Sequence, residues 1–354
     1  MKRSELVKAL ESVMVGVEKS GNSFMMDFVA FDTDWVRSFK DEIAVSYPFP
    51  VGIQAAIKAN EVFKILSKME EEDVTLEVGK EGNSVEVKDG KTTLTLNALQ
   101  KESFKNIINR ASSLITNDLE WFYLPKEFKK GLGLCTLDVK KGKSLEKMAG
   151  VHIEGNLVIS TDSYRVSTFL MDEGVSIPFT IPTETAKQIL GIPVDLTTIS
   201  LTPAWVHLSN ESGVIFSARL LSDIYPVDKV KGAFATMKFD PSGDFFTFPE
   251  GIDKALERAE IMADVGEDIT HLSQVDLSYE NGKMVLTGSR EIGAIREEIV
   301  WNEKHIPEGL RINMVPEYLK RILGITKKFQ ISPTKKGIIL FSDKFQHLMV
   351  VRAK

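Results

Sequence analysis

The sequence contains a single cysteine, Cys135, and no long apolar run. One cysteine excludes an intrachain disulfide, which fits a reducing cytoplasm. No stretch approaches the roughly 18 apolar residues that a membrane-spanning helix needs. The first segment, MKRSELVKALESVMVGVEKSG, begins with basic residues but lacks a continuous apolar core and a small-residue cleavage site. We therefore interpret it as an amphipathic helix rather than a signal peptide, and we expect a cytoplasmic protein.

A surplus of positive charge is also missing. Lys and Arg number 44 and Asp and Glu number 50, so the formal net charge is -6. This balance argues against a general nucleic-acid binder, but it allows a protein that concentrates its positive charge in one place. The 354 residues, 43% of them apolar, are enough for two or three domains with ordinary cores.

Patterns typical of enzymes are absent as well. The five histidines show no metal-ligand spacing, and we expect them at the surface or in turns: His152, His207, His271, His305 and His347. Gly142-Lys143-Ser144 is similar to part of a phosphate-binding loop, but Leu137 stands where the first Gly is required. Cys135 lies in an apolar context typical of a structural thiol. We therefore expect no catalysis, no cofactor and no metal.

One eight-residue pattern recurs six times. The copies are RSELVKAL, ANEVFKIL, PKEFKKGL, PTETAKQI, PEGIDKAL and PEYLKRIL, which start at Arg3, Ala59, Pro125, Pro182, Pro249 and Pro316. Apolar residues at helical spacing, an early acidic residue and an initial Pro in four copies predict helix starts. Every second copy lies 122 to 134 residues further along. This spacing predicts three similar domains of two helices each, at 1–118, 119–238 and 239–354.

After each helix the apolar period changes from 3.6 to 2, which predicts antiparallel strands. Hairpin turns are expected at Asp89-Gly90, Gly155-Asn156, Ser212-Gly213 and Asn281-Gly282. Linkers are expected near 115–119 and 230–239. The fold class is therefore predicted to be α+β, with paired helices packed on antiparallel sheets.

The sixth position of every copy is basic. These residues are Lys8, Lys64, Lys130, Lys187, Lys254 and Arg321, and further cations lie nearby at Lys58, Lys68, Lys129, Arg258 and Lys320. Each could be an ordinary exposed helix residue with no shared task. If the helices lie side by side, however, the cations form a stripe that binds phosphates without reading sequence.

The width of a helix limits how such a stripe can surround DNA. At about 10 Å per helix, six helices in a circle leave almost no hole, whereas twelve leave an opening of roughly 28 Å. Duplex DNA, about 20 Å wide, would pass only through the larger ring, with its grooves facing the helices. Encirclement therefore requires at least two copies of this chain, joined head to tail.

The chain resembles the bacterial DNA sliding clamp, the beta subunit of DNA polymerase III. The resemblance is carried by GVHIEGNLVISTDSYRVS, ARLLSDIYPVDKV, EIGAIREEI and the final HLMVVRAK. It implies a DNA-clamp fold, a homodimeric head-to-tail ring on double-stranded DNA, and a non-catalytic role as a processivity factor. It also implies that polymerase, clamp loader and repair proteins insert short apolar peptides into a groove between the second and third domains.

Residue by residue, the resemblance assigns that groove to Met148, Thr161, Ser163, Tyr164, Arg165, Val166, Pro226, Lys229, Val230, Tyr318, Met349, Val350, Val351 and Arg352. Tyr164 stands where the family usually has His, and the terminal motif differs. For the segment 161–165 a capped turn with a structural contact between Asp162 and Arg165 is an alternative. Two other functions stay open: a monomeric clamp-like DNA-binding or adaptor protein, and a hydrolase built around Asp162 and His152.

Overall fold

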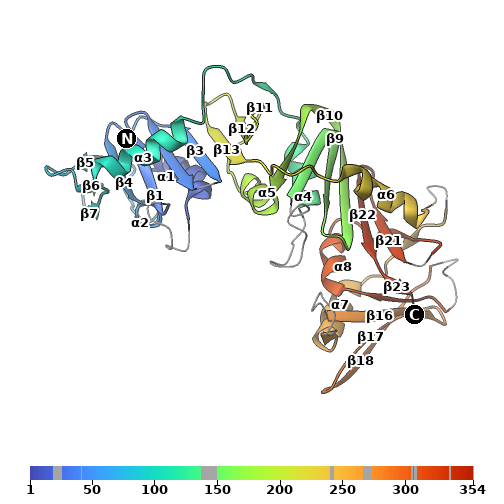
Figure 1. Ribbon diagram of the computed structural model, residues 1–354. Coiled ribbons are helices and arrows are strands. Elements are labelled where there is room, and N and C mark those ends of the chain that lie inside the picture. The colour runs from blue at the N-terminus through green and yellow to red at the C-terminus, as the bar shows by residue number, and fades with distance from the viewer. Residues whose placement is uncertain are drawn as a thin grey trace. The chain divides into compact units, whose positions relative to one another are not determined.

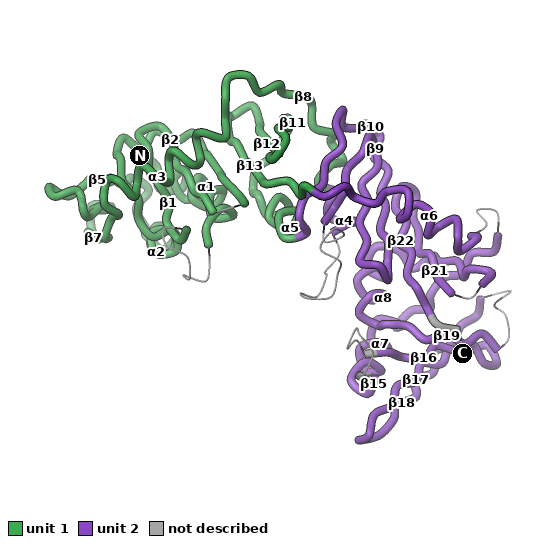
Figure 2. The backbone as a smooth tube through the Cα atoms, viewed as in Figure 1, with its two compact units in different colours: residues 1–129, 184–222 green, residues 130–183, 223–354 purple. Residues whose placement is uncertain are grey.

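The computed structural model describes residues 1–18, 26–40, 42–136, 150–239, 243–265, 273–303, 306, 309–334 and 336–353. Two compact units are present (Figure 2). Unit 1 consists of residues 1–129 and 184–222, and unit 2 consists of residues 130–183 and 223–354. Helices and antiparallel sheets build both units, so the predicted α+β class is confirmed. The three predicted domain ranges stay a prediction.

Unit 1 contains an eight-stranded sheet in the order β4-β1-β2-β3-β13-β12-β11-β8 and a three-stranded sheet in the order β5-β6-β7. The two chain segments of unit 1 are joined by pairing of β3 with β13, for example Val45 with Phe216. The elements are α1 (Arg3–Val13), η1 (Met14–Gly16), β1 (Phe28–Asp32), β2 (Trp35–Lys40), β3 (Ile43–Pro48), β4 (Gln54–Lys58), α2 (Ala59–Leu66), β5 (Thr75–Val78), β6 (Ser84–Lys88), β7 (Thr93–Asn97), α3 (Lys101–Ser112), β8 (Phe122–Tyr123), α5 (Thr183–Leu190), β11 (Thr198–Leu201), β12 (Trp205–Ser209) and β13 (Ile215–Arg219).

Unit 2 contains a six-stranded sheet in the order β14-β20-β21-β22-β10-β9, which we call the β9–β10 sheet, and a second sheet in the order β18-β17-β16-β19-β23 with β15 beside β16 (Figure 1). Its elements are α4 (Phe128–Cys135, which begins in unit 1), β9 (Gly150–Thr161), β10 (Arg165–Pro182), α6 (Val227–Met237), β14 (Phe246–Thr247), α7 (Ile252–Ile261), β15 (Asp264–Val265), β16 (Ser273–Glu280), β17 (Lys283–Arg290), β18 (Gly293–Val300), β19 (Arg311–Met314), α8 (Pro316–Leu323), β20 (Lys328–Ile331), β21 (Gly337–Phe341), β22 (Phe345–Val350) and β23 (Arg352–Ala353).

All six predicted helices are present, as α1, α2, α4, α5, α7 and α8. Two further helices, α3 and α6, escaped the sequence analysis. The range 115–119 has neither helix nor strand, as expected for a linker. The predicted linker at 230–239 is wrong, because most of it lies in α6. Gly232 and several β-branched residues give this segment little helix propensity, so tertiary packing must stabilise it.

Three of the four predicted hairpin turns are present, each at a glycine between two strands. Asn281 and Gly282 have φ of 49° and 77° and connect β16 to β17. Asp89-Gly90 and Ser212-Gly213 also lie between paired strands. The turn at Gly155 is wrong, because β9 continues through it. Gly155, with φ of 56°, lies at a break in the register between β9 and β10, so its left-handed backbone makes a bulge instead of a hairpin.

The β9–β10 sheet has two different faces. Alternation along β10 and β22 places Arg165, Ser167, Phe169, His347 and Met349 on one face, which packs against α4 and which we call the α4 face. The opposite face, the α6 face, carries Leu157, Ile159, Val166, Leu170 and Leu348. The predicted groove residues on these strands are therefore divided between two environments.

Candidate functional site

A tight turn connects β9 to β10 at the centre of the predicted site. The Thr161 hydroxyl donates to the backbone oxygen of Arg165 at 2.8 Å and accepts from the Ser163 N–H at 3.1 Å. Oδ1 of Asp162 accepts from the N–H groups of Tyr164 and Arg165. Ser163 has φ of 74°, a conformation that these bonds hold in place. The turn is thus fixed by its own side chains.

Arg165 is buried in this turn. Its Nε donates to Oδ2 of Asp162 at 2.8 Å, and the two side chains are only 4% and 7% exposed. The guanidinium carbon lies 3.9 Å from the ring centre of Tyr318 on α8. Burial raises the pKa of Tyr318, and the charge of Asp162 adds to this effect. The contact between Asp162 and Arg165 is the structural one that the alternative expected, and a role for Arg165 in holding a peptide stays a prediction.

Strand β22 lies beside this turn. Met349 pairs with Arg165, and the N–H of Val350 donates to the backbone oxygen of Tyr164 at 2.8 Å. Met349 and Val351 are fully buried, whereas Val350 and Tyr164 are 42% and 39% exposed. Ser163 is exposed as well, so Ser163, Tyr164 and Val350 are the accessible side chains of this part of the predicted groove. Met148 and the side chain of Arg352 lie outside the described residues.

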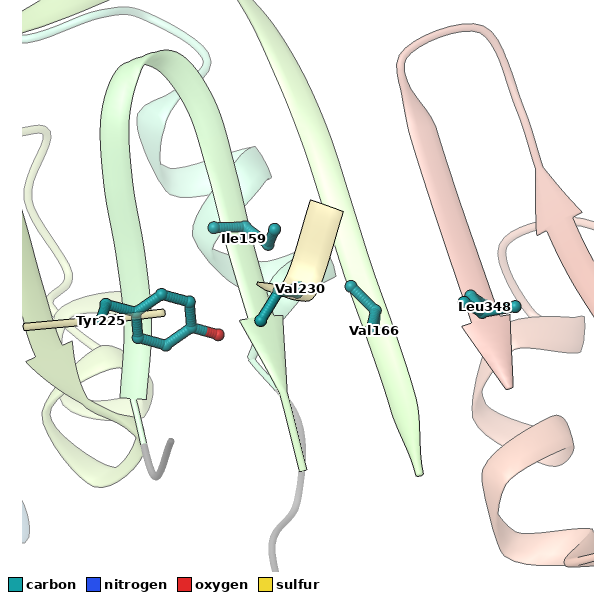
Figure 3. Close-up of a cluster of buried hydrophobic side chains, with 5 residues drawn as sticks. All are labelled: Ile159, Val166, Tyr225, Val230 and Leu348. Atoms are coloured by element: carbon teal, nitrogen blue, oxygen red, sulfur yellow. The ribbon is translucent and has the colours of Figure 1, made fainter. Parts of the chain in front are cut away.

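Five buried residues bring the strands of the α6 face together with α6. The apolar cluster consists of Ile159, Val166, Tyr225, Val230 and Leu348, each at most 6% exposed (Figure 3). Of the other predicted groove residues, Pro226 is half-buried and Lys229 is exposed. Val166 and Val230 were predicted from the sequence, and the other three were not. The period-2 alternation of β9 and β22 was the available signal for Ile159 and Leu348.

A hollow of about 630 Å³ lies on the α6 face next to the apolar cluster. Leu157, Thr168, Leu170 and Gln346 of the sheet line it together with Phe234 of α6. At its rim, Lys231 and Glu154 form an ion pair at 3.6 Å. Leu170 is 50% exposed, so the apolar surface here is only partly covered. No pattern in the sequence predicted this hollow.

The six recurring cations fall on the predicted helices. Lys8, Lys64, Lys130, Lys187 and Lys254 are exposed, and Arg321 is half-buried. In unit 1, α1 packs against α2, and in unit 2, α7 packs against α8, so two pairs of these residues lie on neighbouring helices. Whether all six line one wall stays a prediction.

Several of these cations already have partners. Lys187 pairs with Glu184 at 3.0 Å, and Arg321 donates to the backbone oxygen of Gly133 at 3.1 Å. Lys130 lies 5.5 Å from the ring centre of Phe169. Contacts of this kind reduce what a cation can contribute to phosphate binding, because part of its charge is compensated.

Four of the five additional cations also have partners. Lys129 donates to the backbone oxygens of residues 192 and 194, and burial lowers the pKa of its ammonium group. The ion pairs of the others are Lys58 with Asp27 at 2.9 Å, Arg258 with Glu297 at 2.7 Å and Lys320 with Glu260 at 2.5 Å. The sequence could not reveal these partners, because each is distant along the chain or on another element.

The expectation that the histidines lie at the surface or in turns is wrong for the three that the structure describes. His152, His207 and His347 are 8%, 0% and 0% exposed and lie within strands. Each ring bonds through Nδ1 to a hydroxyl directly across the sheet, on Thr180, Ser217 and Ser167, at 2.7 to 2.8 Å. A strand position accommodates the flat ring, and the hydroxyl opposite satisfies one nitrogen.

Burial lowers the pKa of all three histidines. The pKa of His207 falls to about 4 and that of His347 to about 3, and the nearby charges of Arg165 and Arg321 lower the latter further. These rings are therefore neutral at pH 7 and belong to the core. His271 and His305 lie outside the described residues.

Among the described residues, no three His, Cys, Asp or Glu side chains come together as a metal site. Cys135 is fully buried at the end of α4, and burial raises the pKa of its thiol, so it is a poor nucleophile. No described helix has the length and apolar character that crossing a membrane requires. The loop at 142–144 lies outside the described residues.

Comparisons with known proteins give matches in structure only. No protein-family model matches the chain. No curated protein matches its sequence either. A divergent sequence on a recognised fold would produce this combination.

Solved sliding clamps match the chain from end to end. The sliding clamp of Bacillus subtilis superposes with a TM-score of 0.77 at 18% identity, over 100% of this chain and 98% of that one. The beta subunit of Streptococcus pyogenes gives 0.78 at 16%, over 100% and 99%. The clamp of Bartonella birtlesii, solved with bound griselimycin, gives 0.79 at 15%, over 100% and 98%. This chain therefore has the fold of the bacterial sliding clamp, the beta subunit of DNA polymerase III.

Proposed function

We propose that this protein is a ring-forming sliding clamp that encircles duplex DNA and tethers a polymerase to it. The observation that carries this proposal is the full-length likeness to solved clamps, which extends over both chains in each comparison. The six helices with a basic residue in one register support it. In this role the protein performs no chemistry: it converts loose, sequence-independent contact with DNA into lasting attachment through topology.

Ring closure needs surfaces that another copy can cover. In unit 2, β18 lies at one end of its sheet, so one side of its backbone has no strand partner among the described residues. Ile261, Ile292 and Val300 around this edge are 68%, 81% and 64% exposed. In unit 1, β7 is likewise at the end of a sheet. A head-to-tail ring would pair one such edge with another and bury this apolar surface.

The inner surface of the ring would hold DNA through phosphate contacts. The exposed residues Lys8, Lys64 and Lys254 are the strongest candidates. Arg258 and Lys320 contribute less, because Glu297 and Glu260 already compensate their charge. Binding to linear duplex should therefore be weak, independent of sequence and strongly reduced by salt.

Partner proteins would attach through strand β22 and the turn between β9 and β10. The exposed Tyr164 and Val350 form the accessible edge of this site, and Val166 and Val230 form its apolar floor. Polymerase, clamp loader and repair proteins are the expected partners, each through a short apolar peptide. Tyr164→Ala should weaken such binding without changing assembly, because this side chain projects from the turn.

Retention on circular DNA tests the proposal. Protein loaded on nicked circular duplex should stay bound through a high-salt wash and be lost once the circle is linearised. Equal loss from both forms would overturn encirclement. The variant Ile261→Asp, which places a charge in the proposed interface, should abolish retention and give a monomer in native mass measurement.

Two other functions make different predictions. A monomeric clamp-like adaptor would have the mass of one chain at micromolar concentration and would bind linear and circular DNA equally. A hydrolase built around Asp162 and His152 has little geometric support. Each already has a partner, in Arg165 and Thr180 respectively.

A further inference from the structure

Arg321 differs from the other five residues of the recurring basic register. It is the only arginine among them, and it is half-buried, whereas the five lysines are exposed. Its Nη2 atom donates to the backbone oxygen of Gly133 on helix α4 at 3.1 Å. Burial lowers the pKa of His347, and the charges of Arg165 and Arg321 lower it further, so Arg321 lies near the α4 face. The side chain of Arg321 is therefore directed towards α4 and the interior of unit 2.

The carbonyl that Arg321 contacts belongs to the end of α4. The last carbonyls of an α-helix have no partner within the helix, and a cation there also suits the negative end of the helix dipole. Another of these carbonyls, that of Cys135, accepts from the Ser160 hydroxyl of β9. The end of α4 thus joins α8 to the strand that leads into the turn at Thr161.

A second contact leads from α8 back to the same turn. Tyr318 lies three residues before Arg321, so both side chains are on one side of α8. The guanidinium carbon of Arg165 lies 3.9 Å from the ring centre of Tyr318, which is 7% exposed. The contacts therefore form a closed loop, which runs from α8 through α4 and β9 to the turn and back to α8.

The proposed groove takes residues from two elements that are fixed in different ways. The turn at 161–165 is held by bonds among its own residues. Tyr318 belongs instead to a helix of eight residues, and contacts with other elements must determine where that helix lies. The pair of Lys320 with Glu260 joins α8 to α7, whereas the bond of Arg321 joins α8 to the helix end that also contacts β9. A hydrogen bond requires one geometry, so Arg321 can set the position of the Tyr318 ring against the turn.

We infer that Arg321 is a positioning residue for the proposed groove, which holds Tyr318 against the turn through the end of α4, and that it is not a phosphate contact. This inference rests on the proposed function. Loss of the bond to Gly133 loosens the contact between Tyr318 and Arg165, so a partner peptide meets a less ordered groove and binds more weakly. Binding to DNA stays the same, because the guanidinium is used inside unit 2.

Binding of griselimycin, the ligand with which the Bartonella birtlesii clamp was solved, tests the groove. Arg321→Met removes the donor but keeps a long side chain, and it should raise the dissociation constant about tenfold, equivalent to ~1.4 kcal/mol. Arg321→Lys keeps a donor for Gly133 and should recover most of the affinity. Ser160→Ala breaks the same loop of contacts at a second point and should raise the dissociation constant severalfold. It keeps the test decisive if urea-induced unfolding shows that Arg321→Met does not fold.

Unit 1 offers a matched control. Arg3 is also half-buried, and its Nη1 atom donates to the backbone oxygen of Leu66, the last residue of α2, at 3.1 Å. Arg3→Met therefore removes the same kind of bond from a helix end that is not part of the groove. This variant should bind griselimycin like the unchanged protein.

The salt dependence of binding to linear duplex DNA gives an independent readout. Each phosphate contact that is lost lowers the slope of log affinity against log salt by about 1. Lys254→Met should show this change, and Arg321→Met should not. A reduced slope for Arg321→Met would overturn the inference, because Arg321 would then contact a phosphate.

The outcomes separate the inference from the function on which it rests. If Tyr164→Ala weakens griselimycin binding but Arg321→Met and Ser160→Ala do not, the positioning role is wrong and the groove remains. Equal weakening by Arg321→Met and Arg321→Lys would also overturn the positioning role, because the bond to Gly133 would then be irrelevant. Absence of binding by the unchanged protein, or no effect of Tyr164→Ala, would overturn the proposed groove and the inference with it.

Discussion

The two faces of the β9–β10 sheet are built from alternate residues of the same strands, yet they are covered in different ways. On the α4 face, Phe169, His347 and Met349 are at most 1% exposed. On the α6 face, Leu170 is 50% exposed, and most of the apolar side chains of α6 are only half-buried. One strand can therefore support both a tightly packed face and a less completely covered one.

Polar contacts account for much of this difference. The α4 face includes the ion pair of Arg165 with Asp162 and the bond of His347 to Ser167. It also includes a close approach, since a Cβ on Gly131 would lie 2.8 Å from the Phe169 ring. Such contacts need one geometry, whereas the contacts between α6 and the sheet are mainly apolar and less directional. Directional contacts hold α4 in place, and α6 lacks a comparable set among the contacts described for it.

The largest expected effect separates two adjacent residues of β10. Phe169→Ala should reduce the free energy of unfolding by about 3–5 kcal/mol, because it opens a cavity beneath α4. Leu170→Ala, one residue further along on the α6 face, should cost less than about 1 kcal/mol, since half of its side chain is already in water. Urea-induced unfolding of both variants measures the difference. Equal losses would contradict the distinction between the two faces.

The next effect concerns two ion pairs. Arg165→Ala leaves Asp162 buried without its partner and should cost about 3 kcal/mol. Arg258→Ala breaks a pair in which the arginine is 52% exposed, so it should cost at most about 1 kcal/mol. Thermal unfolding under the same conditions would compare them. A loss of the same size for both would mean that burial does not increase the stabilisation from the ion pair of Arg165 with Asp162.

A third comparison uses pH. The pKa of His347 is lowered from 6.5 to about 3 in the folded state, so folding excludes its proton. The contribution of neutral His347 to the free energy of unfolding is therefore full above pH 6.5. It falls as the pH drops below that value, by about 2 kcal/mol per ~1.5 pH units. His347→Gln should flatten this acid slope. Val230→Ala on the α6 face should lower stability equally at pH 7 and pH 5, because the apolar cluster has no group that titrates in this range.

The smallest effect contrasts two helix glycines. Gly131→Ala in α4 should destabilise the protein by about 1–2 kcal/mol, because its methyl group would clash with Phe169 and Val158. Gly232→Ala in α6 should stabilise α6 by up to ~1 kcal/mol, because its Cβ meets open space. Amide exchange in each helix reports the two changes separately. The same sign at both positions would contradict the contrast.

The elements that the sequence predicts correctly are those that local physics determines. The six helices have an apolar period and an acidic residue in or just before the first turn, and Asn281-Gly282 has the chemistry of a tight turn. Helix α6 was missed because its stability comes from a sheet formed by distant segments. The turn at Gly155 was predicted wrongly because a glycine with a left-handed backbone conformation occurs in bulges as well as in turns.

The candidate site was predictable in part for the same reason. The segment from Thr161 to Val166 holds its shape through bonds within five residues, so its sequence is informative. The stacking of Arg165 on Tyr318 joins residues more than 150 positions apart, and no local pattern predicts it. The buried histidines depend on hydroxyl partners across the sheet, which become visible only when strand register is known.

The single cysteine can serve as a chemical probe of local opening. Cys135 lies under the α4 face, fully shielded from water, and the chain has no other thiol. A thiol reagent can therefore reach it only during moments when α4 separates from β9, so the rate of labelling counts those openings. Compared with amide exchange in α6, this single reaction would tell how much more often one side of the sheet opens than the other.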